Sequence, residues 1–223
     1  MEIGIEERAE RVLSGVPDWI WNGETLPVPV EHIADSCFGL QIRDIEDLRT
    51  APGVPDLPPT QVLSGLLLPA RGEIWVNAAE ARESKPRRRF TISHELGHWC
   101  LHRTGGAVWC RSQAVDPADG SAETRRVDRA DVSTETRPDS SSGVSAETRP
   151  AYRAAASPQP RAAYPPEESE ANEFAAALLM PAHLVRRHYE RLRRRDPDGA
   201  FKSLCAIFET SGAAMSRRLR RVI

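Results

Sequence analysis

Residues 112–166 constrain the fold more than any other part of the sequence, because they contain almost no large apolar side chains. They are rich in Ser, Thr, Arg, Asp, Pro and Ala, and a degenerate repeat recurs every twelve residues, as SAETRR at 121, STETRP at 133 and SAETRP at 145. Such a stretch cannot bury enough surface to offset the entropy lost on ordering, and it lacks the recurring apolar face of a solenoid. The sequence therefore predicts a disordered insertion between two ordered parts, 1–111 and 167–223. A protease-sensitive or partner-binding loop is the alternative interpretation.

The bulk composition excludes several classes of protein. The formal net charge is −2, so the overall charge does not favour binding to nucleic acid or to a membrane surface. No stretch approaches the ~18 apolar residues of a membrane span, and the acidic, amphipathic N-terminus is unlike a signal peptide. The four cysteines show no CxxC spacing and predict neither a disulfide framework nor a zinc knuckle. We expect a cytoplasmic protein.

Hydrophobic spacing predicts the ordered elements on both sides of the insertion. Strands are expected at 63–68 and 73–77, with a turn between them, and a further short strand follows Gly39. Helices are expected at 2–14, 30–38, 88–103, 167–180 and 182–195, and a last helical pair is expected around a break at 210–212. The ordered parts therefore combine helices with a small number of strands.

The segment His94-Glu95-Leu96-Gly97-His98 is the strongest chemical signal. His94 and His98 are four residues apart, so on a helix both imidazoles project from one face, about 6 Å apart along the axis. Two ring nitrogens can then bind one Zn²⁺ at about 2.0–2.1 Å. Glu95 points in a neighbouring direction, where its carboxylate can take a proton from a water at the metal and later deliver it to a leaving amine.

Two surface histidines and a solvated glutamate are the alternative interpretation of this short pattern. Three features argue against it. The pattern lies on a good predicted helix, the apolar-aromatic lead-in 90–92 would bury one face, and Gly97 disfavours a helix by about 1 kcal/mol. Such a glycine makes sense where another part of the chain approaches closely.

A catalytic zinc needs a third protein ligand. His102 continues the same helical row, but it lies about 12 Å from His94 along the axis, too far to share one ion. The longer pattern HExxHxxGxxH also fails, because positions 101 and 104 are Leu and Thr. We therefore expect His102 to support a ligand or to pack.

The next predicted helix supplies better candidates for the third ligand. Glu168 and Asn172 share a face, so Glu168 could bind the metal while Asn172 hydrogen-bonds a ligand. Glu170 projects elsewhere, and Glu167 lacks a polar partner four residues on. Helical facing favours Glu168 over Glu170, although all three could be carboxylates at a helix start. Mn²⁺ or Fe²⁺ would fit the same ligands less well than Zn²⁺.

Two segments resemble the signature motifs of the ImmA/IrrE-type metallopeptidases: FTISHELGHWCLH at 90–102 and ESEANEFAAALLMP at 168–181. The resemblance extends over about 1–110 and 165–223. It implies an α+β, gluzincin-like core with a small sheet and an HExxH helix, followed by a C-terminal helical, helix-turn-helix-like subdomain. It also implies His94, His98 and Glu168 as zinc ligands and Glu95 as the catalytic acid/base. About seventy residues separate the two motifs, more than is usual, but a longer loop costs only ~0.6 kcal/mol per doubling of its length.

The resemblance also implies a substrate, a helix-turn-helix repressor cleaved to release mobile-element or stress-response genes. A non-catalytic regulator, with the C-terminal helices touching DNA, is the competing hypothesis. In its favour, residues 186–223 hold eleven basic and four acidic side chains. Against it, the last arginines alternate with Leu219 and Val222, as in a packed amphipathic helix, and a basic face alone does not read sequence. We therefore do not expect direct nucleic-acid binding.

Overall fold

A computed structural model of the chain describes residues 3–51, 54, 61–102, 109–114 and 166–223. The predicted insertion lies outside the described residues except at its two ends. There, 112–114 belong to a strand and Pro166 begins a helix, so the predicted boundaries are three residues too early and one residue too late. The described residues come from both sides of the insertion and belong to one compact unit.

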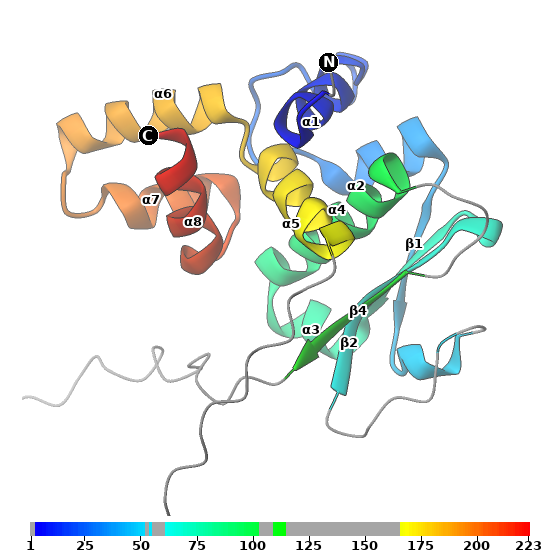
Figure 1. The fold of residues 1–223 in the computed structure, drawn as a ribbon. Helices are drawn as coiled ribbons and strands as arrows, with labels where there is room; N and C mark the ends of the chain where they lie inside the picture. The colour runs from blue at the N-terminus through cyan, green and yellow to red at the C-terminus, as the bar shows by residue number, and fades with distance from the viewer. Residues whose placement is uncertain (1–2, 52–53, 55–60, 103–108, 115–165) are drawn as a thin grey trace, which may run out of the picture. The chain divides into compact units, whose positions relative to one another are not determined.

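The strands form one four-stranded sheet, in the order β1-β3-β2-β4 (Figure 1). Their bounds are Gln41–Ile45 for β1, Gln61–Leu68 for β2, Glu73–Asn77 for β3 and Trp109–Ala114 for β4. β1 runs parallel to β3, while β2 is antiparallel to both β3 and β4. A combination of helices with a small mixed sheet confirms the α+β class.

One hypothesis about the sheet is wrong. From the sequence, residues 73–77 could form an edge strand that holds an extended peptide, although Ile74 and Val76 fit a core strand equally well. In the structure β3 is paired on both sides, with β1 and with β2, so its main-chain groups are already used. β4, which begins six residues beyond the predicted helix 88–103, lies at the end of the strand order instead.

Alternating side chains give the sheet two buried faces. Leu67, Ile74 and Val76 point to the face covered by the long helices and join the main core. Leu66, Leu68 and Trp75 point to the other face and form a smaller cluster with Leu48. The sheet is therefore covered on both sides, which explains the nearly continuous apolar run in β2.

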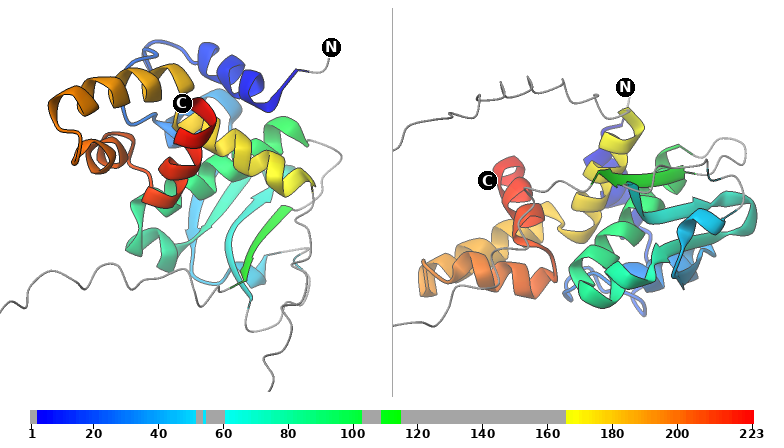
Figure 2. Two further views of the ribbon diagram at one scale, coloured as in Figure 1. Left: turned by 60° about the vertical axis from the view of Figure 1, so that its left-hand side comes forward. Right: turned by 90° about the horizontal axis from the view of Figure 1, so that it is seen from below.

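One long helix packs on β2 and β3 at the first face of the sheet, and a second long helix packs against it (Figure 2). α4, Lys85–Leu101, begins at Ser84, whose hydroxyl accepts a hydrogen bond from the Arg87 amide, and it has Pro86 in its first turn. α5, Pro166–Leu179, packs against α4 and against α1, Ile5–Ser14. α2, Val30–His32, continues into a π-helical turn, Ile33–Cys37. The helix predicted at 30–38 is therefore confirmed. The short helix α3, Ala78–Glu83, is not predicted from the sequence.

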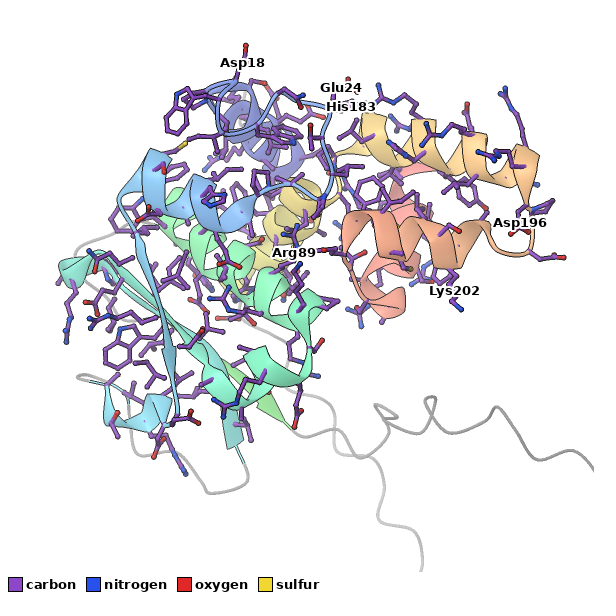
Figure 3. All side chains as sticks on the ribbon, turned by 180° about the vertical axis from the view of Figure 1, so that it is seen from behind. Asp18, Glu24, Arg89, His183, Asp196 and Lys202 are labelled. Carbon is purple, nitrogen blue, oxygen red and sulfur yellow. The ribbon has the colours of Figure 1, made fainter. Side chains whose placement is uncertain are left out.

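The C-terminal residues form three more helices: α6 at Ala182–Arg195, α7 at Ala200–Phe208 and α8 at Gly212–Val222. The predicted helix 182–195 and the break at 210–212 are confirmed. Buried arginines connect these helices to the rest of the chain. Arg89 of α4 (Figure 3) donates to the Val28 carbonyl and lies 3.8 Å from a carboxylate oxygen of Glu209, between α7 and α8. None of the described helices is long and apolar enough to cross a membrane.

Candidate metal centre

The functional residues of α4 are buried although they are polar. His94, Glu95 and His98 are all 0% exposed, between the sheet on one side and α5 on the other. Burying polar and ionisable groups is costly unless they are paired or bind a metal. A helix that buries three such groups within five residues therefore indicates a site, not a surface pattern.

α5 brings one carboxylate to the two imidazoles. The Nε2 atoms of His94 and His98 are 3.0 Å apart. The Glu168 carboxylate reaches both of them, with Oε2 at 3.2 Å from His94 Nε2 and Oε1 at 3.3 Å from His98 Nε2. The three residues thus form a group that could hold a metal ion.

The spacing of these atoms fits one small cation. Ligand atoms placed about 2.0–2.1 Å from a tetrahedral zinc ion lie about 3.3 Å from one another. The contacts of 3.0, 3.2 and 3.3 Å are close to that spacing, with one Glu168 oxygen facing each imidazole, and one ligand atom from each of the three residues lies within 4.8 Å of the others. Two imidazoles and one carboxylate are also the donor set of many catalytic zinc sites, which keep a fourth position open.

The electrostatics of the group favour an ionised Glu168. Burial alone raises the pKa of this carboxyl, but its interactions with the adjacent His94 and His98 imidazoles outweigh burial and lower its pKa to about 2. Glu168 is therefore a carboxylate at neutral pH, the form in which it can bind a metal.

Asn172 fixes the proton of His94. Its Oδ1 lies 3.1 Å from Nδ1 of His94. An amide oxygen only accepts hydrogen bonds, so Nδ1 of a neutral His94 must carry the proton and donate. The lone pair of the ring is then on Nε2, the atom that faces His98 and Glu168. This is the contact expected of Asn172 from its position one turn after Glu168.

His102 and Glu170 continue the polar group on the far side of His98. Nδ1 of His102 lies 3.2 Å from Nδ1 of His98, and Nε2 of His102 lies 2.7 Å from Oε2 of Glu170. His102 thus contacts the ring of His98 and not the centre of the cluster, as the helical spacing predicts. Glu170 faces His102, so it is Glu168 and not Glu170 that faces the two Nε2 atoms.

Gly65 of β2 is a site residue that the sequence analysis does not identify. A Cβ atom at this position would lie 2.3 Å from Cγ2 of Thr91 and 2.8 Å from Oε1 of Glu95. The Glu95 carboxylate therefore lies directly against the backbone of the strand, where only glycine leaves room for it. A glycine inside a strand often marks such a close approach. Gly65 within the predicted strand 63–68 is therefore the sequence feature that could have indicated this contact.

Gly97 has a similar role on the other side of α4. A Cβ there would lie 3.2 Å from Cα and O of Ala171 and from Cδ1 of Phe174. The predicted close approach of another chain segment is confirmed, and the segment is α5. Because Gly97 and Ala171 are small, the two helices cross closely enough for Glu168 to reach the histidines.

A comparison with known protein families matches residues 59–127 to the IrrE N-terminal-like domain, a peptidase family. The match covers less than a third of the chain and supports an ImmA/IrrE assignment. The match spans β2, β3, α3, α4 and β4, and so includes His94, Glu95 and His98. It ends before α5, so the place of Glu168 comes from the geometry of the cluster and not from the match. No curated protein matches the chain.

The ImmA/IrrE assignment and the cluster together indicate a metal-dependent, peptidase-type protein. Tyr164, considered from its sequence position as an oxyanion donor, lies outside the described residues.

Proposed function

We propose that this chain is a zinc-dependent endopeptidase with a gluzincin-like core, in which His94, His98 and Glu168 hold the metal. The supporting observation is the convergence of the two Nε2 atoms and the Glu168 carboxylate, all within 3.3 Å of one another, beside the buried Glu95. Zinc is the metal that best suits this donor set, because two imidazoles and one carboxylate, with a fourth position open for water, are a usual set of ligands for catalytic zinc.

Glu95 is the proposed acid/base. When bound, zinc lowers the pKa of a coordinated water toward ~7 and polarises a peptide carbonyl. The Glu95 carboxylate accepts the proton released as water attacks the carbonyl, and then delivers it to the leaving amine. Its contact with the Gly65 backbone holds it between the sheet and the metal ligands and limits its movement.

The proposed position of the substrate follows from the sheet. Gly65 of β2 lies against Glu95, and its partner in β4 is Arg111. β4 ends the strand order, so the main-chain groups on its outer side point away from β2. An extended peptide pairing with β4 would gain main-chain hydrogen bonds and would run close to the metal ligands.

The proposed substrate class is a helix-turn-helix repressor, as the ImmA/IrrE resemblance implies. Cleavage would release mobile-element or stress-response genes from repression. An enzyme with this substrate would share its compartment, the cytoplasm.

Glu95→Gln is the test of this proposal. The chain is co-expressed with candidate helix-turn-helix repressors from the same genome, any encoded beside its gene first, and the cleavage products are followed by mass spectrometry. Gln has the size of Glu but cannot take the proton, so we expect cleavage to fall at least a hundredfold, with the zinc content and the circular dichroism spectrum unchanged.

The matched control is Glu83→Gln, which removes an exposed carboxylate of α3 outside the cluster and should leave cleavage unaltered. Derepression in cells that persists with Glu95→Gln would show that peptidase activity is not the function of this protein.

The contacts of the C-terminal arginines weigh against the DNA-binding alternative. Arg218 is 2% exposed and its guanidinium pairs with Glu6 of α1, while Arg221 pairs with Glu173 of α5. Arg218 is therefore used inside the chain, and Arg221 pairs with α5 at the surface. An isolated 182–223 segment that bound DNA, with an affinity falling steeply as salt rises, would support the alternative.

A further inference from the structure

We propose that Asn77 is a positioning residue for Glu95: its side chain fixes a β-bulge in β2 that holds the Gly65 backbone against the Glu95 carboxylate. The inference rests on the proposed role of Glu95 as acid/base and names a residue on which that role depends. Asn77 is the last residue of β3, and it acts on Glu95 only through the neighbouring strand and helix.

The pairing of β2 with β4 contains one extra residue in β2. Leu63 pairs with Ser112, but the next paired residue of β2 is Gly65, which pairs with the adjacent Arg111. Ser64 lies between the two pairs and is the bulged residue. A β-bulge bends its strand locally, and such bulges often lie beside active sites, where they change the direction of a side chain.

The bulge decides which side chains of β2 face α4. In a regular strand Leu63 and Gly65 would share a face, because side chains alternate. Leu63 instead lies with Leu66 in the smaller core cluster on the far face, while Gly65 faces Thr91 and Glu95 of α4. The extra residue thus lets β2 bury a leucine on one face and present glycine to Glu95 on the other.

The Asn77 amide makes one hydrogen bond at each end. Its Nδ2 donates to the main-chain carbonyl of Leu63 at 3.0 Å, immediately before the bulge. Its Oδ1 accepts from the Glu80 amide at 3.1 Å and so caps α3. The main-chain pairing of β2 with β3 reaches only to Gly65. The Asn77 side chain therefore extends the connection between the two strands past the bulge.

The capped helix α3 leads to Glu95 from the other side. Ser84 lies at the end of α3 and caps the start of α4. Glu80 of α3 pairs at 3.0 Å with Arg87 in the first turn of α4. Asn77 thus connects the strand against which Glu95 lies with the start of the helix that carries Glu95. These two contacts require one donor and one acceptor, which an amide side chain supplies.

A plain helix cap is the competing explanation. Asn is a favoured N-cap residue, and its hydrogen bond to the Leu63 carbonyl would then be incidental. Asp and Ser are also favoured N-cap residues. Asp has no donor at neutral pH, and the shorter Ser cannot cap α3 and reach the Leu63 carbonyl together. Asn77→Asp and Asn77→Ser therefore keep the cap and remove the contact with β2.

The first measurement is hydrogen–deuterium exchange of the metal-free protein, followed by mass spectrometry of peptides from β2 and α3. We expect peptides that cover 62–67 to exchange about 3–10-fold faster in Asn77→Asp and Asn77→Ser than in the wild type, because the bulge loses a hydrogen bond. Peptides that cover 78–83 should keep the wild-type rate. Equal exchange of β2 in all three proteins would leave Asn77 as a helix cap alone and overturn the proposal.

Ser64→Ala is the matched control for the exchange measurement. Ser64 is 0% exposed, but its hydroxyl has no hydrogen-bond partner among the residues that the structure describes. Its loss should leave the exchange of β2 at the wild-type rate. A Ser64→Ala protein that exchanged as fast as Asn77→Asp would show that the serine fixes the bulge, and the proposal would be wrong.

The second measurement is a double-mutant cycle between Asn77→Ser and Gly65→Ala, by urea denaturation. In the wild-type background the added methyl group must enter space occupied by Thr91 and Glu95, and we expect the unfolding constant to rise about 5–150-fold. In the Asn77→Ser background β2 can move away from α4, so Gly65→Ala should raise the unfolding constant severalfold less. Additive effects of the two substitutions would show that Asn77 does not hold the strand against Glu95.

The third measurement is the cleavage rate of the repressor that the wild type cuts in co-expression, with purified proteins. We expect kcat to fall about tenfold in Asn77→Ser, with KM and zinc content near those of the wild type, because a misplaced acid/base slows the chemical step and leaves binding unchanged. A lower zinc content, or a higher KM at unchanged kcat, would contradict a role in positioning Glu95.

These outcomes separate the role of Asn77 from the proposed function. If the wild type cleaves no repressor, the peptidase proposal fails, and the exchange rates and the double-mutant cycle still decide whether Asn77 holds β2 against Glu95. If the wild type cleaves the repressor and Asn77→Ser cleaves it equally fast, the positioning role is wrong and the peptidase proposal stands.

Discussion

At the scale of single residues, the site depends on polar side chains that α4 buries against a strand containing glycine. Thr91, His94, Glu95 and His98 are all 0% exposed. The identities of the site residues could be predicted from the sequence, because the spacing of His94, Glu95 and His98 carries the chemistry and helical facing favours Glu168. The partners Gly65 and Glu170 could not, because their roles depend on how a strand and a second helix approach α4.

Gly65→Ala tests the contact between the strand and Glu95. The new methyl group would lie 2.3 Å from Thr91 Cγ2 and 2.8 Å from Glu95 Oε1, so α4 or the Glu95 side chain must move. We expect a destabilisation of about 1–3 kcal/mol and a loss of peptidase activity larger than any loss of zinc. Urea denaturation and zinc content measure the two effects.

Gly15→Ala is the control for this substitution. Gly15 is exposed, has an ordinary right-handed backbone conformation, and would place its Cβ no closer than 3.5 Å to other atoms. It should change the free energy of unfolding by less than about 0.5 kcal/mol. A Gly65→Ala protein with the stability and activity of the wild type would show that Glu95 does not lie against β2.

Cysteine reactivity tests the packing at the C-terminal end of α4. Burial raises the pKa of the Cys100 thiol to about 12, whereas Cys37 is exposed. Only the thiolate reacts, and at pH 8 a thiol of that pKa is ionised in about one molecule in ten thousand. With iodoacetamide at pH 8, peptide mass spectrometry should show Cys37 modified first and Cys100 modified only after unfolding. Equal rates for the two cysteines in the folded protein would contradict the packing.

At the scale of elements, the candidate site forms where α4 and α5 cross. Gly97 of α4 meets Ala171 of α5, and the metal-facing residues of both helices lie within one turn of this contact. The small residue in α4 made the close approach predictable, but the sequence did not show which segment approaches Gly97. β4 and α3 were not predicted, because WCRSQA and AAEARE lack the alternation or apolar face that marks a strand or helix from sequence.

Arg218→Met tests how α8 is attached to the other helices. The Arg218 guanidinium donates to the Met180 carbonyl at 2.8 Å and pairs with Glu6, and its side chain is 2% exposed. Methionine keeps the apolar volume but loses these charged hydrogen bonds, so we expect a destabilisation of about 2 kcal/mol. Thermal unfolding followed by circular dichroism measures the change.

Arg220→Met is the matched control on the same helix. Arg220 is exposed and contacts only Ser216 among the side chains of the described residues, so its loss should cost less than about 0.5 kcal/mol. If both variants were equally stable, the buried contacts of Arg218 would not hold α8 in place.

At the scale of the whole molecule, the metal cluster joins parts of the chain that lie on opposite sides of residues 115–165. The division into two ordered parts followed from composition, and the mixed fold followed from the hydrophobic spacing. The register and order of the strands could not be derived, because they depend on long-range pairing that no local pattern encodes.

Zinc should therefore stabilise the folded chain as a whole. A ligand that binds only the native state, at a free concentration one hundred times its Kd, adds about 2.7 kcal/mol. For an ordered part of this size, each kcal/mol shifts Tm by about 2–4 °C, which predicts a rise of about 5–10 °C on adding zinc to the metal-free protein. His94→Ala should abolish the shift in differential scanning calorimetry. A shift of the same size in His94→Ala would place the stabilising metal elsewhere.

The central claim is that one metal ion is bound jointly by the two helices. Anomalous diffraction at the zinc absorption edge, from crystals of the zinc-loaded chain, locates the metal directly. The account predicts a single strong peak about 2.0–2.2 Å from Nε2 of His94, from Nε2 of His98 and from a carboxylate oxygen of Glu168. A peak elsewhere in the chain, or a peak at the histidines with the Glu168 carboxylate turned away from it, would contradict the account.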